Sequence, residues 1–446
     1  DGPIEVNAIK DGEVIETVWV EPGSKKNTVL LESNSLDEVR IDVGKDIPEL
    51  NRQNNSWSRQ GLFNKIEKPK LEFLIGDNEP ERTNIFWTPM IAGNSHDKLM
   101  LGAAFHNYGL PFNKFNYFIA PLYSTGRNSI SGFSEFSYTT QPKKFIKHSK
   151  LGLSIKSFNL NDSIESYYLA ATPYWQIKIG NRGNKSSISQ TFRLQGLSRY
   201  DQYEFYNSMK VGAYASYKFN YKTTNHHFSF TIRNEYINST SASDVVPDST
   251  LSLDDMARVI VEGNYRFKYL QKMNRWIEIR AFIGNIYFSN FNDKAGFHNE
   301  YGMSLSGSAG YQDLFLDEYY LGRNNTTGFT SQQRSENMGG FKSTASYGTT
   351  SYWMATTNLY IQLPLKPGIF GAFVDYGMFN NGLTNNTALN VGLAIRLGKV
   401  LGVYFPLYMS DQLKDSFGSA GYGEKIRFTL KLNPFNSGFN ITDMFN

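Results

Sequence analysis

The last quarter of the chain alternates between apolar and polar residues with a period of two. Between Thr350 and Phe435, five segments carry apolar side chains at one parity and polar side chains at the other. In one of them Val374 and Tyr376 share the apolar parity, and Asp375 lies between them. Successive side chains of a β-strand point to opposite faces, so the pattern predicts five strands with one apolar and one polar face.

These segments have the length of roughly ten residues that a tilted strand needs to cross a bilayer. Eleven further candidate strands precede them, between residues 84 and 288. Large soluble sheets rarely sustain such alternation, whereas a membrane barrel needs it and leaves no strand edge in lipid. We therefore predict an all-β fold, a 16-stranded antiparallel transmembrane β-barrel preceded by a small partial β-sandwich.

Composition narrows the possible functions. Aromatic residues make up 15% of the chain, with 28 Tyr and 33 Phe, which suits the aromatic girdles of a barrel. The chain contains 0 Cys, which excludes disulfides and thiolate metal sites. A net charge of +4 over 446 residues gives no reason to expect nucleic acid as a partner.

Turn signals and alternation divide the chain into four parts. We predict a partial, periplasmic β-sandwich at 1–47, a linker or plug segment at 48–83, the outer-membrane barrel at 84–435 and a C-terminal tail at 436–446. The strands expected in the first part are Ile4–Ile9, Val14–Val20, Thr28–Leu31 and Val39–Val43. Four short strands are half a sandwich at best, so we expect a missing partner upstream.

The connection at 290–347 is much longer than a hairpin needs, and loops of this length are usually functional or disordered. Basic residues such as Lys156 and Arg258 outnumber acids on the predicted inner face. They indicate either an anion-attracting channel or a solvated wall plugged by the long loop. We favour the plugged wall.

Residues 19–55 carry a first resemblance. The runs Trp19–Glu21, Val39–Asp42 and Asn51–Asn55 resemble the end of the β-sandwich domain of aminopeptidase-N-like zinc gluzincins, in the bacterial lineage that continues into a membrane barrel. The resemblance implies an envelope aminopeptidase whose zinc site lies upstream. The His-Glu-x-x-His motif of that family does not occur in this sequence. We expect no catalytic residue, metal ligand or cofactor within this chain.

A second resemblance covers about 300–435. Gly328-Phe329 and the strand Phe373–Gly377 are similar to the loop tip and wall strand of the sixteen-stranded superfamily that includes the outer-membrane assembly insertase and two-partner secretion transporters. In that superfamily the loop enters the lumen, and an Arg of its tip meets an acid on the wall. Thr327 occupies the Arg position here, so a buried Asp375 needs another partner. The candidates for this loop lock are Arg323, Arg334 and Arg396.

The segment Gly423–Phe435 looks like the closing strand that the outer-membrane assembly machinery recognises in this superfamily. Its signal residues would be Phe428, Leu430, Leu432 and Phe435. The polypeptide-transport repeats of the insertases are not recognisable in residues 1–80.

The function we expect from the sequence is an outer-membrane barrel anchor of a larger envelope protein, a zinc aminopeptidase, in a Gram-negative bacterium. The alternatives are an insertase-like or polypeptide-transport barrel, or a subunit of an outer-membrane complex. A diffusion porin ranks below both. The expected partners are outer-membrane lipid, the assembly machinery and other envelope proteins.

Overall fold

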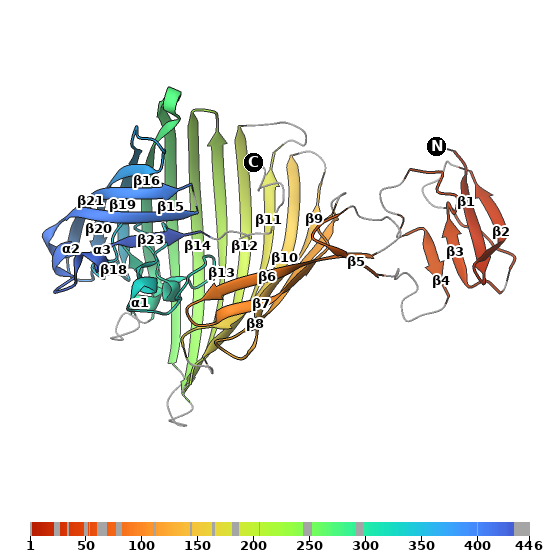
Figure 1. Ribbon diagram of the computed structural model, residues 1–446, viewed down its shortest axis with the longest axis horizontal. Coiled ribbons are helices and arrows are strands. Elements are labelled where there is room, and N and C mark those ends of the chain that lie inside the picture. Colours follow the sequence, from red (N-terminus) through yellow and green to blue (C-terminus); the bar gives the residue numbers. More distant parts are fainter. Residues whose placement is uncertain are drawn as a thin grey trace. The chain divides into compact units, whose positions relative to one another are not determined.

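The computed structural model describes residues 2–21, 27–33, 35–48, 52, 54–59, 69–76, 83–109, 113–142, 145–162, 166–180, 187–204, 206–243, 252–290, 298–398 and 400–431 (Figure 1). The chain forms two compact units, Asp1–Pro89 with Ala103–Phe118 and Met90–Gly102 with Ile119–Asn446.

A small sheet opens the chain, in the order β2-β1-β3-β4. Its strands are β1 (Ile4–Lys10), β2 (Glu13–Val20), β3 (Glu38–Ile41) and β4 (Ser56–Ser58). Asp11 and Gly12, which both have positive φ (52° and 86°), join β1 to β2 in the tight turn that such pairs favour.

Two details of this sheet differ from the prediction. Thr28–Leu31 is not a strand. The backbone N–H groups of Glu32 and Ser33 donate to the carboxylate of Glu16 at 3.0 Å, so a side chain takes the place of a strand ladder there. The sheet is completed instead by β4, a three-residue strand in the segment predicted as linker.

The barrel strands close in the order β10 to β16, β19 to β23, then β5 to β9. They are β5 (Pro69–Phe73), β6 (Thr83–Asn94), β7 (Lys98–His106), β8 (Phe115–Ser124), β9 (Ser129–Thr140), β10 (Ile146–Asn159), β11 (Tyr167–Ile179), β12 (Ile188–Gln202), β13 (Tyr206–Lys222), β14 (His226–Ser243), β15 (Ser252–Leu270), β16 (Arg275–Ser289), β19 (Trp353–Gln362), β20 (Phe370–Asn380), β21 (Asn385–Leu397), β22 (Leu401–Met409) and β23 (Arg427–Leu430).

The all-β barrel is therefore confirmed. The sixteen predicted strands correspond to β6–β16 and β19–β23, and β5 is an additional strand that runs parallel to β6. Pairing from β9 to β16 and from β19 to β23 is antiparallel throughout. The domain boundaries proposed from the sequence remain predictions. Leu432, Phe435 and the tail at 436–446 lie outside the described residues.

Burial is inverted relative to a soluble sheet protein. On β20, Asp375 is 0% exposed, whereas its neighbours Val374 and Tyr376 are 37% and 47% exposed. The same alternation leaves apolar side chains exposed along the strands, among them Ile91, Leu101, Ile119, Ile130, Leu151, Leu169, Trp175, Leu194, Val211, Ile232, Ile279, Ile283, Leu393 and Leu407. No helix in the described part of the chain is long and apolar enough to span a membrane.

Candidate functional site: the loop inside the barrel

The connection between β16 and β19 packs against buried side chains of the barrel wall. Its short elements are α1 (His298–Tyr301), β17 (Met303–Ser304), η2 (Gly310–Gln312), η3 (Phe329–Gln332) and β18 (Thr349–Thr350). β17 pairs with β18, which brings the two ends of the loop together. Loop side chains including Met303, Leu305, Phe315 and Phe341 share one buried cluster with the wall residues Leu197, Ile237, Phe282 and Phe379. We call residues 298–350 the lumenal loop.

Two glycines allow the lumenal loop to fold back on itself. A Cβ on Gly339 would lie 2.4 Å from the backbone of Leu305, and Gly340 has a φ of +64°. At this crossing the N–H of Gly339 donates to the carbonyl of Ser304 at 3.0 Å, and that of Phe341 donates to Leu305 at 2.8 Å. The Gly-Gly pair therefore lets the chain turn so that the backbone of Lys342, two residues after Gly340, faces the barrel wall.

Asp375 on β20 receives that residue. Its carboxylate accepts the backbone N–H of Lys342 at 2.7 Å and the Lys342 ammonium at 3.1 Å. Asn358 and Asn390, its register partners on β19 and β21, donate their side-chain amides to it at 2.9 and 3.3 Å. A fully buried carboxylate needs such partners, and two of these four bonds come from the loop.

Arg427 on β23 is the second buried charge at the boundary between loop and wall. Its exposed fraction is 0%, and its guanidinium donates to the carbonyl oxygens of Ser335 and Phe341. Both acceptors belong to the lumenal loop, so the last described strand is attached to the loop by a charged group.

The loop also binds the backbone edge of β23. The N–H of Arg334 donates to the carbonyl of Phe428 at 3.1 Å, and Gln333 forms a parallel bridge with Phe428. The ring of Phe329 stacks on that of Phe428 with centroids 4.6 Å apart. The segment 329–334 therefore contacts β23 through both its backbone and a ring.

Glu336 extends this contact along the wall. It accepts the Lys431 ammonium at 2.9 Å and the Tyr404 hydroxyl at 2.8 Å, and Arg396 lies 3.9 Å from it. One loop carboxylate is thus shared by β21, β22 and the residue that follows β23. Such charge-assisted bonds are stronger than neutral ones and fix orientation.

A separate ion-pair group holds the loop to the other side of the barrel. Lys210 on β13 contacts Glu300 of α1 and lies 3.2 Å from Asp201 on β12. Arg233 on β14 bonds to Asp317 at 2.9 Å. The loop is therefore fixed to widely separated strands.

The structure corrects the partner expected for Asp375. Arg323 bonds to Asp313 within the loop at 3.2 Å, and Arg396 bonds to Glu278 on β16 at 2.8 Å. Arg334 meets β23 through its backbone. Lys342 is the partner of Asp375 instead, because the turn at Gly339 and Gly340 places it beside that carboxylate. Lys342 directly follows Phe341 of the Met-Gly-Gly-Phe run. That glycine pair is the sequence signal for a turn that brings Lys342 to the wall.

The loop tip also lies elsewhere than the resemblance implied. Gly328, with a φ of +77°, precedes Phe329, whose ring is 67% exposed and contacts Phe428 of the closing strand. Thr327 has no charge to pair with the wall acid, so the tip makes an apolar contact instead. Of the other closing-strand residues, Leu430 lies in β23 opposite Leu401.

Glu318 in the loop has a perturbed carboxyl group. Burial, together with the nearby carboxylates of Asp313 and Asp317, raises the pKa of Glu318 to about 7 against the opposing charge of Lys431. Part of the protein therefore carries a neutral Glu318 near neutral pH. Within the described residues, no three His, Asp or Glu side chains gather closely enough to hold a metal ion.

Several solved structures are similar to the chain. The chain is similar to CdiB from Acinetobacter baumannii, at 10% identity and a TM-score of 0.31, over 74% of this chain. The match spans 57% of the CdiB chain. No protein-family profile matches the chain, and no curated protein matches it. Neither the family profiles nor the curated proteins support the aminopeptidase expected from residues 19–55.

Proposed function

We propose that the chain is an outer-membrane β-barrel of the insertase and polypeptide-transport class, closed at rest by its lumenal loop. The observation that carries the proposal is the attachment of the loop to the last strand through Arg427, Phe428 and Lys431.

The outward apolar surface supports the membrane location. Apolar side chains are exposed on the outer face of the strands, whereas charged residues such as Asp201, Arg258 and Asp375 are buried inside. A charge on the lipid face would cost roughly 2–4 kcal/mol at the bilayer midplane, and the inward face avoids this cost. The outer membrane is where bacterial barrels of this kind are found.

The contacts of β23 support the transport class. β22 pairs with β23 through four residue pairs, from Leu401 with Leu430 to Tyr404 with Arg427. The loop also bonds to the backbone of β23 at Phe428. If the loop withdrew, the backbone groups that it occupies on β23 would be unpaired, and unpaired strand groups readily pair with another extended polypeptide. Loop movement and access to a strand edge are thereby coupled.

A cysteine pair tests this coupling, because the chain has no native cysteine. Gln333 and Phe428 are bridge partners, and paired strands lie about 4.8 Å apart, within the roughly 4.4–6.8 Å that a disulfide spans between Cα atoms. We would reconstitute Gln333→Cys with Phe428→Cys in liposomes and follow the folding of an unfolded outer-membrane barrel added outside. The reduced form should accelerate folding over empty liposomes, and the oxidised form should not. Equal rates in the two forms would contradict the proposed coupling.

The second candidate is a membrane anchor for an envelope enzyme. The four-stranded sheet β2-β1-β3-β4 favours it, because an anchor carries a domain outside the membrane. This proposal includes the zinc aminopeptidase implied by the resemblance of residues 19–55. Intact mass and peptide sequencing of the protein from native outer membrane would test it. A mass well above 50.7 kDa with a His-Glu-x-x-His peptide would favour the anchor, and a mass near 50.7 kDa would remove the aminopeptidase.

A further inference from the structure

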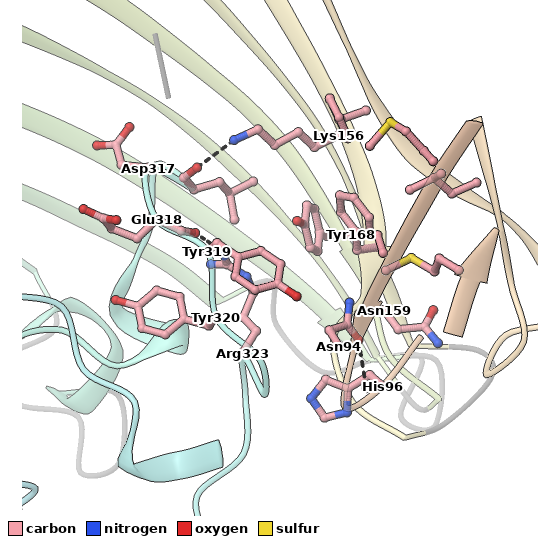
Figure 2. Close-up of a pocket in the computed structure, with 17 residues that line it drawn as sticks. Asn94, His96, Lys156, Asn159, Tyr168, Asp317, Glu318, Tyr319, Tyr320 and Arg323 are labelled. Carbon is pink, nitrogen blue, oxygen red and sulfur yellow. Dashed lines mark hydrogen bonds between the residues drawn. The ribbon is translucent and has the colours of Figure 1, made fainter. Parts of the chain in front are cut away.

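A cavity lies between the lumenal loop and the wall strands β6 to β11. Its volume is about 110 Å³, and its lining includes Met100, Phe133, Lys156, Leu316 and Tyr319 (Figure 2). A single water needs roughly 10–15 Å³ on the same measure. The cavity therefore has room for several waters or one small organic molecule.

One end of the cavity holds a cation that is not fully bonded. The Lys156 ammonium donates to the carbonyl of Leu316 at 2.9 Å (Figure 2). No carboxylate of the described residues lies within salt-bridge distance of it. An ammonium has three donors, so the one bond to a neutral carbonyl leaves two donors for another acceptor. An anionic group is the acceptor that best offsets the cost of enclosing this charge.

The other charged groups near this end are compensated. Arg323 bonds to Asp313 at 3.2 Å, and Asp317 bonds to Arg233 at 2.9 Å. The raised pKa of Glu318, about 7, keeps part of that carboxyl neutral. The remaining positive charge is that of Lys156.

Much of the cavity lining is apolar. Met90 and Met100, on β6 and β7, and Leu122, Phe133 and Phe158, on β8, β9 and β10, contribute to its lining. Met100 and Leu122 are each 1% exposed. Ligand sites combine such an apolar wall with a few polar groups that fix orientation.

Unbonded polar atoms lie among the lining residues distant from Lys156 in Figure 2. Asn159 and His96 are each 3% exposed. Both amide atoms of Asn159 and Nε2 of His96 have no hydrogen-bond partner within the described structure. Buried polar groups are nearly always bonded to protein or water. These unbonded atoms indicate that water molecules occupy the end of the cavity away from Lys156.

We propose that this cavity binds a small amphipathic anion, with its carboxylate on Lys156 and its apolar body against Met100, Leu122, Phe133 and Phe158. The molecule would touch both the wall and the loop, because Leu316 and Tyr319 belong to the loop. Binding therefore stabilises the docked position of the loop. The proposal does not depend on what the barrel transports.

Decanoate is the probe we would use first. Binding of radiolabelled decanoate to the full chain in amphipol is measured by equilibrium dialysis against empty amphipol, with decanol as the neutral comparison. We expect one saturable site in the wild type. Lys156→Met should weaken decanoate binding at least tenfold and leave decanol binding unchanged. Lys178→Met, a loss of the same charge on β11 outside the cavity lining, should bind decanoate like the wild type.

Met100→Trp, which fills the cavity, should abolish both decanoate and decanol binding. The proposal is overturned if the wild type shows no saturable site, or if Lys156→Met and Met100→Trp bind decanoate like the wild type. A diazirine-bearing decanoate cross-linked to the wild type covers the case of a variant that fails to fold. Label on peptides that contain Met100, Phe133 or Leu316 supports the site, and label confined to outward-facing residues overturns it.

Discussion

Asp375 and Lys342 form a buried ion pair between the wall and the loop. The Asp375 side chain is fully buried and that of Lys342 is 8% exposed. A buried pair gains little over an apolar pair of the same volume, but the loss of one partner leaves a charge stranded. The Asp375–Lys342 pair therefore specifies where the loop docks, because the loop fits the wall only where both charges meet.

The variant Asp375→Asn tests this pair. Asparagine keeps the shape of the Asp375 side chain but leaves the Lys342 ammonium buried without a negative partner. This change should destabilise the docked loop by about 3–5 kcal/mol. The measurement is protease sensitivity of the lumenal loop together with the thermal midpoint. Combining it with Lys342→Met should restore most of the loss, since no charge is then left buried. If the single variant protects its loop as the wild type does, the pair has no role in docking.

Asp42 makes the small sheet sensitive to acid. Burial raises the pKa of Asp42, but hydrogen bonds from the N–H groups of Ile47 and Asp46 and the charge of Arg52 lower it by more, to below its ordinary 3.8. The ionised carboxylate is thus bound more tightly in the folded sheet than in the unfolded chain. Its contribution to stability is present above pH 3.8 and is lost as the pH falls through the lower, folded value.

Hydrogen exchange of peptides from β1 to β4, corrected for intrinsic rates, measures this dependence in the full chain. Protection should hold from about pH 6 to pH 4 and fall below that, whereas Asp42→Asn should be less protected throughout and lack this step. Asp37→Asn is the control, because Asp37 is a carboxylate near the same sheet that accepts the N–H of Asp11 in an exposed hydrogen bond. Identical pH profiles for the wild type and Asp42→Asn would contradict this account.

At the scale of elements, β23 and the lumenal loop are joined by several contacts, so we expect them to move together. Residues on both sides of β23 contact the loop. The carbonyl of Gly423 accepts a hydrogen bond from the Gln332 amide, and Lys431, which follows β23, pairs with Glu336. Between them lie the two bonds of Arg427 and the edge pairing of Phe428. Release of the loop should therefore loosen β23.

Arg427→Met is the direct test of this connection between β23 and the loop. Hydrogen bonds to charged groups contribute about 1.5–3 kcal/mol each, so losing both should raise opening of β23 and residues 335–341 by roughly a hundredfold or more. Hydrogen exchange on these two segments is the readout. Lys425→Met removes the same charge two residues earlier, where the ammonium contacts the ring of Phe417, and should change little. Equal exchange in the two variants would show that Arg427 does not join them.

The barrel strands could be predicted from the sequence because alternation repeats in each of them. The predicted segments 115–124 and 167–179 agree with β8 and β11 at both ends. Thr28–Leu31 misled the prediction because a short β-branched run has no length to average over. For the site, the sequence indicated that Asp375 faces inward and needs a partner. It did not identify Lys342, whose position depends on how the loop turns at Gly339 and Gly340.

At the scale of the whole molecule, the barrel strands expose apolar side chains on one face and bury charged side chains on the other, against which the lumenal loop packs. The buried cluster of Met303, Leu305, Phe315 and Phe341 packs the loop against the wall, ion pairs on β13, β14 and β20 fix it there, and Arg427 on β23 donates to its backbone carbonyls. A barrel of this strand number would otherwise leave an aqueous channel. The account therefore predicts a barrel that is closed until its loop is released.

The most direct test of this claim is conductance of the purified protein in planar lipid bilayers. The wild type should show no channel steps, and the combined variant Asp375→Asn with Arg427→Met should show frequent ones. Lys425→Met, which leaves the loop contacts of Asp375 and Arg427 intact, should stay silent. Steady conductance by the wild type at the level of the combined variant would contradict the account, because the lumen would then be open with the loop in place.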